Sequence, residues 1–220
     1  MLSMSNDIFY QNRAAMVQNQ LIPRGITDQN VLNVMTKVPR HEFVPENMAS
    51  VAYEDSALPI EGGQTISQPF MVAVMTQLLN LDKGKKVLEV GTGSGYQAAV
   101  LAEIAGHVYT IETIASLSHK AQDVINKLGY KNVEFIVGDG TQGYAQAAPY
   151  DAIIVTAAAP SIPSALTEQL SEGGTLVVPV GNRWKQTLNI VKKSGDKLTV
   201  EEKIDCVFVP LLGKYGWKSE

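Results

Sequence analysis

The chain has 220 residues, of which 45% are hydrophobic and 18% are charged, so it is long enough for an α/β domain with a proper core. Its net charge of −4 argues against a dedicated nucleic-acid binder, which needs a basic surface. No apolar run approaches the roughly 18 residues that a membrane-spanning helix needs, and the N-terminus lacks the features of a signal peptide. The single cysteine, Cys206, cannot form an internal disulfide. We therefore expect a cytoplasmic protein.

The first 80 residues are predicted to be helical, with one long irregular segment between the helices. Apolar residues recur at helical spacing over residues 8–22, 28–39 and 69–81. Thr27 or Asp28 can cap the second of these helices. Residues 53–69 contain prolines and glycines, and a loop of this length inside a compact domain is usually functional. The loop leads into the third helix, so we expect residues 65–68 beside a helix N-terminus, whose free N–H groups favour an anion.

From Lys86 onward the pattern alternates between strands and helices. Strands are predicted at residues 86–90, 107–112, 133–137, 151–155 and 174–180, and helices at residues 95–105, 114–128 and 162–170. Such alternation implies a parallel sheet with helices on both faces. Two consecutive strands then follow, at residues 186–193 and 197–209, and they suggest an antiparallel edge. The predicted fold is a doubly wound, Rossmann-like α/β sheet, mostly parallel, with antiparallel C-terminal strands and an N-terminal helical cover.

No internal repeat or linker divides the chain, so we expect a single domain over residues 1–220. Residues 1–80 would form the helical cover and the substrate loop. Residues 81–181 would form the cofactor-binding core, and residues 182–220 the C-terminal strands and tail.

The most informative stretch is residues 87–96, which read V-L-E-V-G-T-G-S-G-Y. A short buried strand leads into a turn that contains Gly91, Gly93 and Gly95, and a helix follows. Glycines leave room for a ligand to lie on the backbone. The spacing differs from the G-x-G-x-x-G of dinucleotide sites, and the carboxylate of Glu89 would repel a pyrophosphate and favour a ligand with an ammonium group. By itself, such a turn is equally compatible with a purely structural role.

Two further acidic residues follow the next two strands. Glu112 lies about 20 residues beyond the glycine turn, where an acidic side chain accepts hydrogen bonds from both ribose hydroxyls. Asp139 follows the third strand, where a carboxylate can accept the exocyclic amine of adenine. With Glu89, these residues meet at the carboxyl edge of a parallel sheet and predict S-adenosyl-L-methionine, which has an amino acid group, a ribose and an adenine but no phosphate. The predicted cofactor-binding residues are Thr65, Ile66, Glu89, Gly91, Thr92, Gly93, Ser94, Gly95, Glu112, Asp139 and Gly140.

The stretch after the fourth strand limits the class of methyl acceptor. Residues 156–160 lack the Asn/Asp-Pro-Pro-aromatic signature of many amine methyltransferases. No cluster of Asp, Asn and His suggests the metal site that catechol acceptors usually need. A carboxylate needs neither metal nor base, because its pKa of about 4 leaves it ionised at pH 7. Residues 65–67 can supply hydroxyl and backbone donors that hold such a group.

Seven segments along nearly the whole chain carry a resemblance to a known family: residues 38–45, 57–60, 63–69, 87–99, 150–158, 173–181 and 208–211. The T-I-S-Q-P segment together with E-V-G-T-G-S-G-Y is the most specific part. In these segments the chain resembles the bacterial type of the protein-L-isoaspartate O-methyltransferase family. The resemblance implies methyl transfer from S-adenosyl-L-methionine to the free carboxylate of L-isoaspartyl residues. The ester then collapses to a succinimide, which reopens partly to aspartate, so the implied role is repair of damaged proteins and peptides.

The resemblance also assigns roles outside the glycine turn. Ser67 falls on the family's active-site serine and would orient the substrate carboxylate, although serine before a helix is most often a cap. The family's C-terminal segment beside the peptide site falls on residues 208–212, where main-chain hydrogen bonds suit an enzyme that tolerates many sequences. Many bacterial members carry Arg before this segment, where this chain has Val207. The implied substrate-binding residues are Thr65, Ser67, Val209, Pro210 and Leu211, with Ser67 as the catalytic one.

The implied partners are isoaspartyl proteins and peptides. We expect no nucleic acid, membrane or metal partner, and a monomer. Three alternatives stay open: an S-adenosyl-L-methionine-dependent methyltransferase of a small-molecule carboxylate or other nucleophile, a nucleotide-binding dehydrogenase, and a non-catalytic cofactor-binding module. Asp55, in the loop before Ser67, is equally compatible with lining the site and with a turn.

Overall fold

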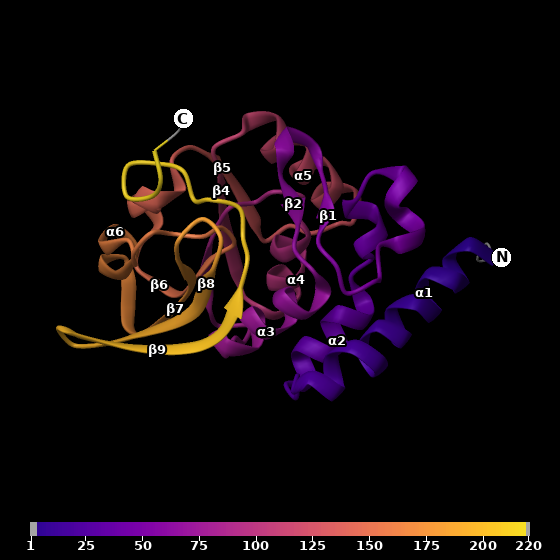
Figure 1. The fold of residues 1–220 in the computed structure, drawn as a ribbon, viewed down its shortest axis with the longest axis horizontal. Coiled ribbons are helices and arrows are strands. Elements are labelled where there is room, and N and C mark those ends of the chain that lie inside the picture. The colour runs from indigo at the N-terminus through magenta and orange to yellow at the C-terminus, as the bar shows by residue number, and fades with distance from the viewer. Residues whose placement is uncertain (1–3, 219–220) are drawn as a thin grey trace.

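Seven strands form one central sheet in the order β5-β4-β3-β6-β7-β8-β9 in a computed structural model that describes residues 4–218 (Figure 1). The strands are β3 (Lys86–Val90), β4 (His107–Glu112), β5 (Val133–Val137), β6 (Tyr150–Val155), β7 (Leu170–Gly181), β8 (Gln186–Ser194) and β9 (Lys197–Cys206). The first five are parallel, whereas β8 and β9 are each antiparallel to the strand before them. The predicted fold class is therefore confirmed.

Helices cover both faces of this sheet (Figure 1). On one face, α3 (Pro69–Leu79), α4 (Tyr96–Ile104) and α5 (Ala115–Lys127) pack on strand residues such as Val87. The other face carries α6 (Ser164–Glu168) and the C-terminal segment, which pack on Leu88 and Val90. Neighbouring β3 residues thus enter opposite cores, as expected of a strand buried on both faces.

The predicted N-terminal cover consists of α1 (Met4–Met16), which continues as a π-helical turn (Val17–Leu21) and a 3₁₀ turn (Ile22–Arg24), and α2 (Gln29–Lys37). Asp28 is the N-cap of α2, because its carboxylate accepts the N–H groups of Asn30 and Val31 at 2.8 and 3.3 Å. Both helices lie outside α3 and α4 (Figure 1). No helix within residues 4–218 is both long and apolar enough to span a bilayer.

The irregular stretch at 53–69 contains a small hairpin of β1 (Leu58–Pro59) and β2 (Thr65–Ile66), joined by a 3₁₀ turn (Glu61–Gly63). The hairpin rests on the start of α5, where Glu61 forms an ion pair with Lys120. Other 3₁₀ turns are Arg40–Phe43, Glu46–Val51, Gly140–Gln142 and Ala145–Ala147. The hairpin therefore holds the loop in place over the carboxyl end of the sheet.

Element boundaries differ from the prediction mainly in the C-terminal half. The predicted helix at 162–170 is shorter, and β7 begins at Leu170, because Leu170 pairs with Tyr150 of β6. The predicted strand at 197–209 ends at Cys206. Beyond it the chain leaves the sheet edge, and Pro210 forms a parallel bridge with Ala158. This departure brings the C-terminal segment toward the ends of the parallel strands.

Candidate functional site

A cavity opens at the carboxyl ends of β3, β4 and β6. The strand order changes direction at this point, because β4 and β5 lie on one side of β3 while β6 and β7 lie on the other. Its empty space, including the open mouth, is about 1000 Å³. Four segments form its walls: the β2 hairpin with the start of α3, the glycine turn with α4, the loops after β4, β5 and β6, and the C-terminal residues 209–212. Segments distant in the sequence therefore converge on one site.

Most of the predicted site residues line this cavity. Thr65, Ile66, Ser67, Gly91, Thr92, Gly93, Ser94, Glu112, Gly140, Val209, Pro210 and Leu211 do so. Glu89, Gly95 and Asp139 do not belong to the lining. Gly95 lies against α5, Glu89 is buried beneath the glycine turn, and Asp139 bonds to the C-terminal tail.

The glycine turn is held in a conformation that L side chains rarely adopt. Gly91 has φ +98° and donates its N–H to the carbonyl of Ile111 at 2.9 Å. A Cβ on Gly91 would lie 2.4 Å from Oγ1 of Thr156, which donates to the Gly91 carbonyl at 2.6 Å. Gly95 is the N-cap of α4, and a Cβ there would lie 2.9 Å from Cβ of Ala121. Gly95 thus allows α4 and α5 to approach each other, which explains why it is absent from the lining.

We expect Gly91→Ala to lower the free energy of unfolding by about 3 kcal/mol, because strain at positive φ adds to the clash with Thr156. Urea denaturation measures this change. The matched control is Gly173→Ala, which also has positive φ (+72°) but open space around its Cβ position. It should cost only about 1 kcal/mol. Equal losses in the two variants would contradict the role assigned to Thr156.

Glu112 is the only charged side chain in the described lining of the cavity. It is buried, and its carboxylate accepts the N–H groups of Gly93 and Ile114, each at 3.0 Å. These bonds fix the carboxylate at the end of β4 and also tie the glycine turn to that strand. The Thr113 hydroxyl also donates to Oε1 at 3.3 Å. Because a carboxylate offers about four acceptor positions, capacity remains for a hydroxyl group of a ligand.

Glu89 lies fully buried beneath the turn, one residue before the end of β3. Its Oε2 accepts the hydroxyl of Thr110 at 2.5 Å, and that hydroxyl lies 2.6 Å from Oγ1 of Thr92, which lines the cavity. The Oε1 atom is buried without a hydrogen-bond partner among the described residues. Burial raises the pKa of Glu89 to about 8 despite the Thr110 hydrogen bond, and the nearby Glu112 charge adds to the rise. Glu89 therefore reaches the cavity through two threonines.

Asp139 serves the C-terminal tail and not the cavity. One oxygen accepts the backbone N–H and the hydroxyl of Thr141, and the other accepts the amide of Gln142 and the backbone N–H of Lys214. Burial favours a higher pKa, but the hydrogen bonds from Lys214, Thr141 and Gln142 outweigh it and hold the pKa of Asp139 below its usual value. Four donors of the chain already reach this carboxylate, and its predicted contact with the exocyclic amine of adenine stays a prediction.

Ser67 lies half-buried in the cavity wall between β2 and α3. Its hydroxyl makes no hydrogen bond with any residue in the described part of the chain, and the N-cap of α3 is Gln68, so Ser67 does not cap the helix. The helix end is not an open anion site either. Asp55 accepts the N–H of Phe70 at 3.0 Å and pairs with Arg24, which corrects the prediction of free N–H groups. The hydroxyl groups of Ser67 and Thr65 are the available side-chain donors at this wall.

The sequence analysis missed several lining residues, among them Val72, Met75, Gln97, Thr156 and Ala157. Met75 and Gln97 sit within helices whose periodicity indicated only core packing. Thr156 follows β6, and its position after a parallel strand was a usable signal. The peptide-side segment is expected at residues 208–212, and residues 209–212 of it line the cavity.

The charge of the lining limits the ligand. Among the described residues of the lining there is no Lys, Arg or His, and the sole ionisable acid there is Glu112. A pyrophosphate would have no counter-charge in such a cavity, whereas a neutral nucleoside with a cationic tail is compatible with it. The cavity therefore suits a phosphate-free nucleoside on the glycine turn and a second ligand beside Ser67.

A family model matches residues 11–216 of the chain. Its description is protein-L-isoaspartate(D-aspartate) O-methyltransferase. A relative from Geotalea uraniireducens named protein-L-isoaspartate O-methyltransferase 2 is 54% identical over 94% of this chain and 96% of its own length. A relative from Methanoculleus marisnigri named protein-L-isoaspartate O-methyltransferase is 50% identical over 99% of both chains.

Solved structures agree with these sequence matches. One, named protein-L-isoaspartate O-methyltransferase, superposes with a TM-score of 0.82 at 30% identity and covers 94% of this chain and 67% of its own. A second comes from Plasmodium falciparum, carries the same enzyme name and was solved in complex with S-adenosyl-L-homocysteine. It superposes with a TM-score of 0.78 at 27% identity and covers 91% of this chain and 98% of its own.

Proposed function

This chain belongs to the protein-L-isoaspartate(D-aspartate) O-methyltransferase family, and from that premise we propose that its cavity holds S-adenosyl-L-methionine on the glycine turn and the isoaspartyl carboxylate beside Ser67. The chain is an enzyme that methylates the free carboxylate of L-isoaspartyl residues in proteins and peptides. The observation that carries the site assignment is a cavity without a cation, with the Glu112 carboxylate on one wall and the Ser67 hydroxyl on another.

The residues of the cofactor side fit this ligand. Glu112 keeps acceptor capacity for a ribose hydroxyl beside its three bonds within the chain, and residues 91–94 offer backbone with little side-chain bulk. Glu89 lies beneath this turn and reaches the cavity through Thr110 and Thr92, so its carboxylate can favour a cationic ligand without touching it. When bound, S-adenosyl-L-methionine supplies a methyl group that its sulfonium has already activated for transfer.

The chain's own contribution on the acceptor side is to position the carboxylate and keep water out. A carboxylate is ionised at neutral pH, so no general base is needed. The hydroxyl of Ser67 can donate one hydrogen bond that orients an acceptor oxygen. The β1–β2 hairpin covers this side of the cavity and would exclude water around the bound carboxylate. We assign the catalytic role to Ser67 and substrate contacts to Thr65, Val209, Pro210 and Leu211.

The test is a pair of peptides that differ only in one linkage. The enzyme is incubated with tritiated S-adenosyl-L-methionine and either an L-isoaspartyl peptide or its normal aspartyl isomer. We expect label only in the isoaspartyl peptide, as an ester that is lost in mild base. Equal labelling of both peptides, or a base-stable product, would contradict the proposal and favour methyl transfer to another nucleophile.

Three finer assignments accompany this proposal. We infer a single functional domain over residues 1–220, a monomer that acts without nucleic acid, and a location in the cytoplasm. The connected core around one sheet supports the single domain. The acidic net charge of −4 supports action without nucleic acid. Light scattering of the purified protein tests the monomer, and a mass near twice 23.8 kDa would contradict it.

A further inference from the structure

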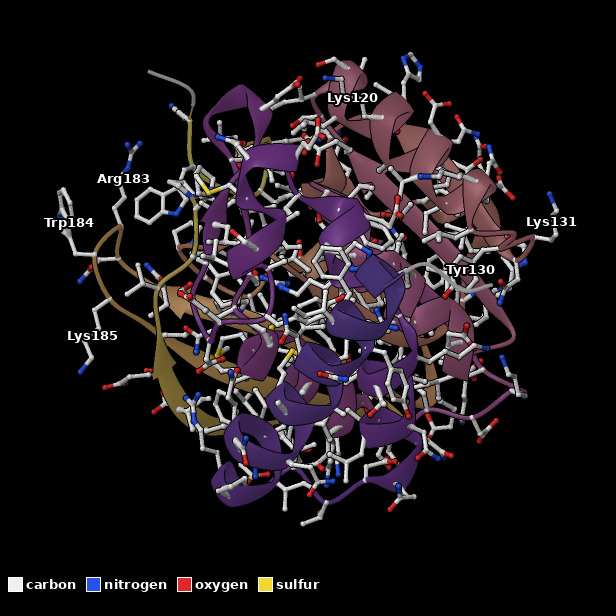
Figure 2. All side chains as sticks on the ribbon, turned by 90° about the vertical axis from the view of Figure 1, so that its right-hand side faces the viewer. Lys120, Tyr130, Lys131, Arg183, Trp184 and Lys185 are labelled. Carbon is white, nitrogen blue, oxygen red and sulfur yellow. The ribbon has the colours of Figure 1, made fainter. Side chains whose placement is uncertain are left out.

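An exposed aromatic and basic loop follows β7 at the carboxyl edge of the parallel strands, the same edge at which the cavity opens. Residues 182–185 connect β7 to β8 and are called here the tryptophan loop. Figure 2 shows Arg183, Trp184 and Lys185 pointing outward from the edge of the molecule. The Trp184 side chain is 85% exposed. An indole so open to water contributes nothing to the core, whereas tryptophan is among the residues most enriched at binding hot spots.

The loop is rigidly connected to the C-terminal wall of the cavity. At its start, Gly181 donates its N–H to the carbonyl of Ala159 at 3.1 Å. At its end, the Gln186 side chain accepts the N–H of Phe208 at 2.8 Å, directly before the residues that line the cavity. Two ends of one short loop are thus tied to the segment that forms the peptide-side wall.

A second connection runs through the tail. The Arg183 guanidinium lies 5.4 Å from the centre of the Trp217 ring. Trp217 donates its indole N–H to the carbonyl of Ala158 at 3.1 Å and its backbone N–H to that of Leu211 at 2.7 Å. Since Leu211 lines the cavity, the tail that carries Trp217 links Arg183 of the loop to the wall of the proposed substrate site.

The charge of this surface differs from that of the whole protein. The net charge of the chain is −4, but residues 206–218 contain Lys214 and Lys218 and no acidic residue. Arg183 and Lys185 add positive charge beside them, although Lys185 pairs with Asp205. A polypeptide that carries an isoaspartyl residue is itself acidic at that position, so a local basic surface favours it where the whole molecule would repel it.

Val207 extends the apolar part of the same surface. It follows Cys206, which pairs with Gln186 at the end of the loop, and its side chain is 75% exposed.

We propose that the tryptophan loop and Val207 form a docking surface for the polypeptide chain that carries the isoaspartyl residue. Trp184 packs against an apolar side chain of the substrate outside the immediate neighbours of the isoaspartyl residue, and the surrounding lysines favour acidic flanks. This inference rests on the proposed function. It predicts that long substrates gain affinity from the loop and that short ones do not.

The test compares two isoaspartyl peptides with wild type, Trp184→Ala and the control Val200→Ala. The short peptide has three residues and the long one about 15, with leucine and glutamate on both flanks. Val200 is an exposed apolar residue (52%) on β9, without contact to the loop in the strand register. We expect Trp184→Ala to raise KM for the long peptide about tenfold, the effect of losing one anchor side chain, with kcat unchanged. KM for the short peptide and all constants of Val200→Ala should stay at wild-type values.

An unchanged ratio of the two KM values in Trp184→Ala would overturn the docking surface, as would an equal rise for both peptides. Failure of the proposed function is distinct, because then the wild type would methylate neither peptide. In that case, the docking surface is tested by the affinity of the labelled long peptide, measured by fluorescence anisotropy. Weaker binding to Trp184→Ala than to wild type supports the surface, and equal binding overturns it.

Discussion

Ser67→Ala should lower kcat for an isoaspartyl peptide about 100-fold while the Kd for S-adenosyl-L-methionine stays within about threefold of wild type. A hydrogen bond to a charged group contributes about 1.5–3 kcal/mol, and each 1.4 kcal/mol is a factor of about ten. The effect belongs to the acceptor, because Ser67 lies in the wall formed by β2 and α3 and not in the glycine turn, and its hydroxyl bonds to no described residue. Single-turnover kinetics and calorimetric titration measure the two quantities.

The folded state should be almost unaffected by this change. The N-terminal N–H of α3 is satisfied by Asp55, so removal of the serine hydroxyl removes no cap. The matched control is Ser116→Ala, an exposed serine on α5, which should keep both constants. If the cofactor Kd of Ser67→Ala rises in step with the loss of kcat, then Ser67 acts on the cofactor side and the assignment is wrong.

Glu89→Gln should have opposite effects on stability and on cofactor binding. In the ligand-free protein the carboxyl has a pKa of about 8, above the value of about 4.5 for an exposed glutamate. A group whose pKa is higher in the folded protein than in the unfolded chain stabilises the fold fully at pH values below its unfolded-state pKa. This stabilisation is lost as the pH rises through the folded-state pKa. Ligand-free wild type should therefore lose stability between about pH 4.5 and 8, relative to the variant, because the variant cannot ionise at this position.

Thermal unfolding of the ligand-free proteins from pH 5 to 8.5 measures this difference. We expect the Tm of Glu89→Gln minus that of wild type to grow as the pH rises. Calorimetric titration at pH 8 should show weaker S-adenosyl-L-methionine binding by about 30-fold, because the cation loses a buried counter-charge. Glu202→Gln, on the exposed face of β9, is the control and should change neither. A Tm difference that is constant with pH would show that Glu89 is not the titrating group.

Local sequence was sufficient for most of the fold. The predicted strands at 86–90, 107–112 and 133–137 match β3, β4 and β5 at both ends. These strands are short apolar runs, and the glycine or polar residues on either side mark where each strand begins and ends. Boundaries failed where a partner decided them: Leu170 joins β7 because Tyr150 lies beside it, and β9 stops at Cys206 because the next residues bond elsewhere.

In the candidate site, too, some residues are recognisable from local sequence, whereas others depend on a tertiary contact. The glycine turn and Glu112 are recognisable from their positions at strand ends, whereas the role of Ser67 follows from the family resemblance, and the structure brings all of them to one cavity. Asp139 carried the same local signal, yet its carboxylate is taken by Lys214, 75 residues away. A strand-end carboxylate shows where an acceptor lies but not which donor reaches it.

The sequence by itself determined the α/β class, the glycine turn and the segments that mark the family. These features depend on contacts between near neighbours along the chain or on residue identity alone. Only the tertiary structure decided that Asp55 occupies the end of α3, that Thr110 and Thr92 connect Glu89 to the cavity, and that the tryptophan loop borders the peptide wall. Each of these depends on a hydrogen bond between residues at least 15 positions apart, and such pairs become neighbours only when the sheet order brings their segments together.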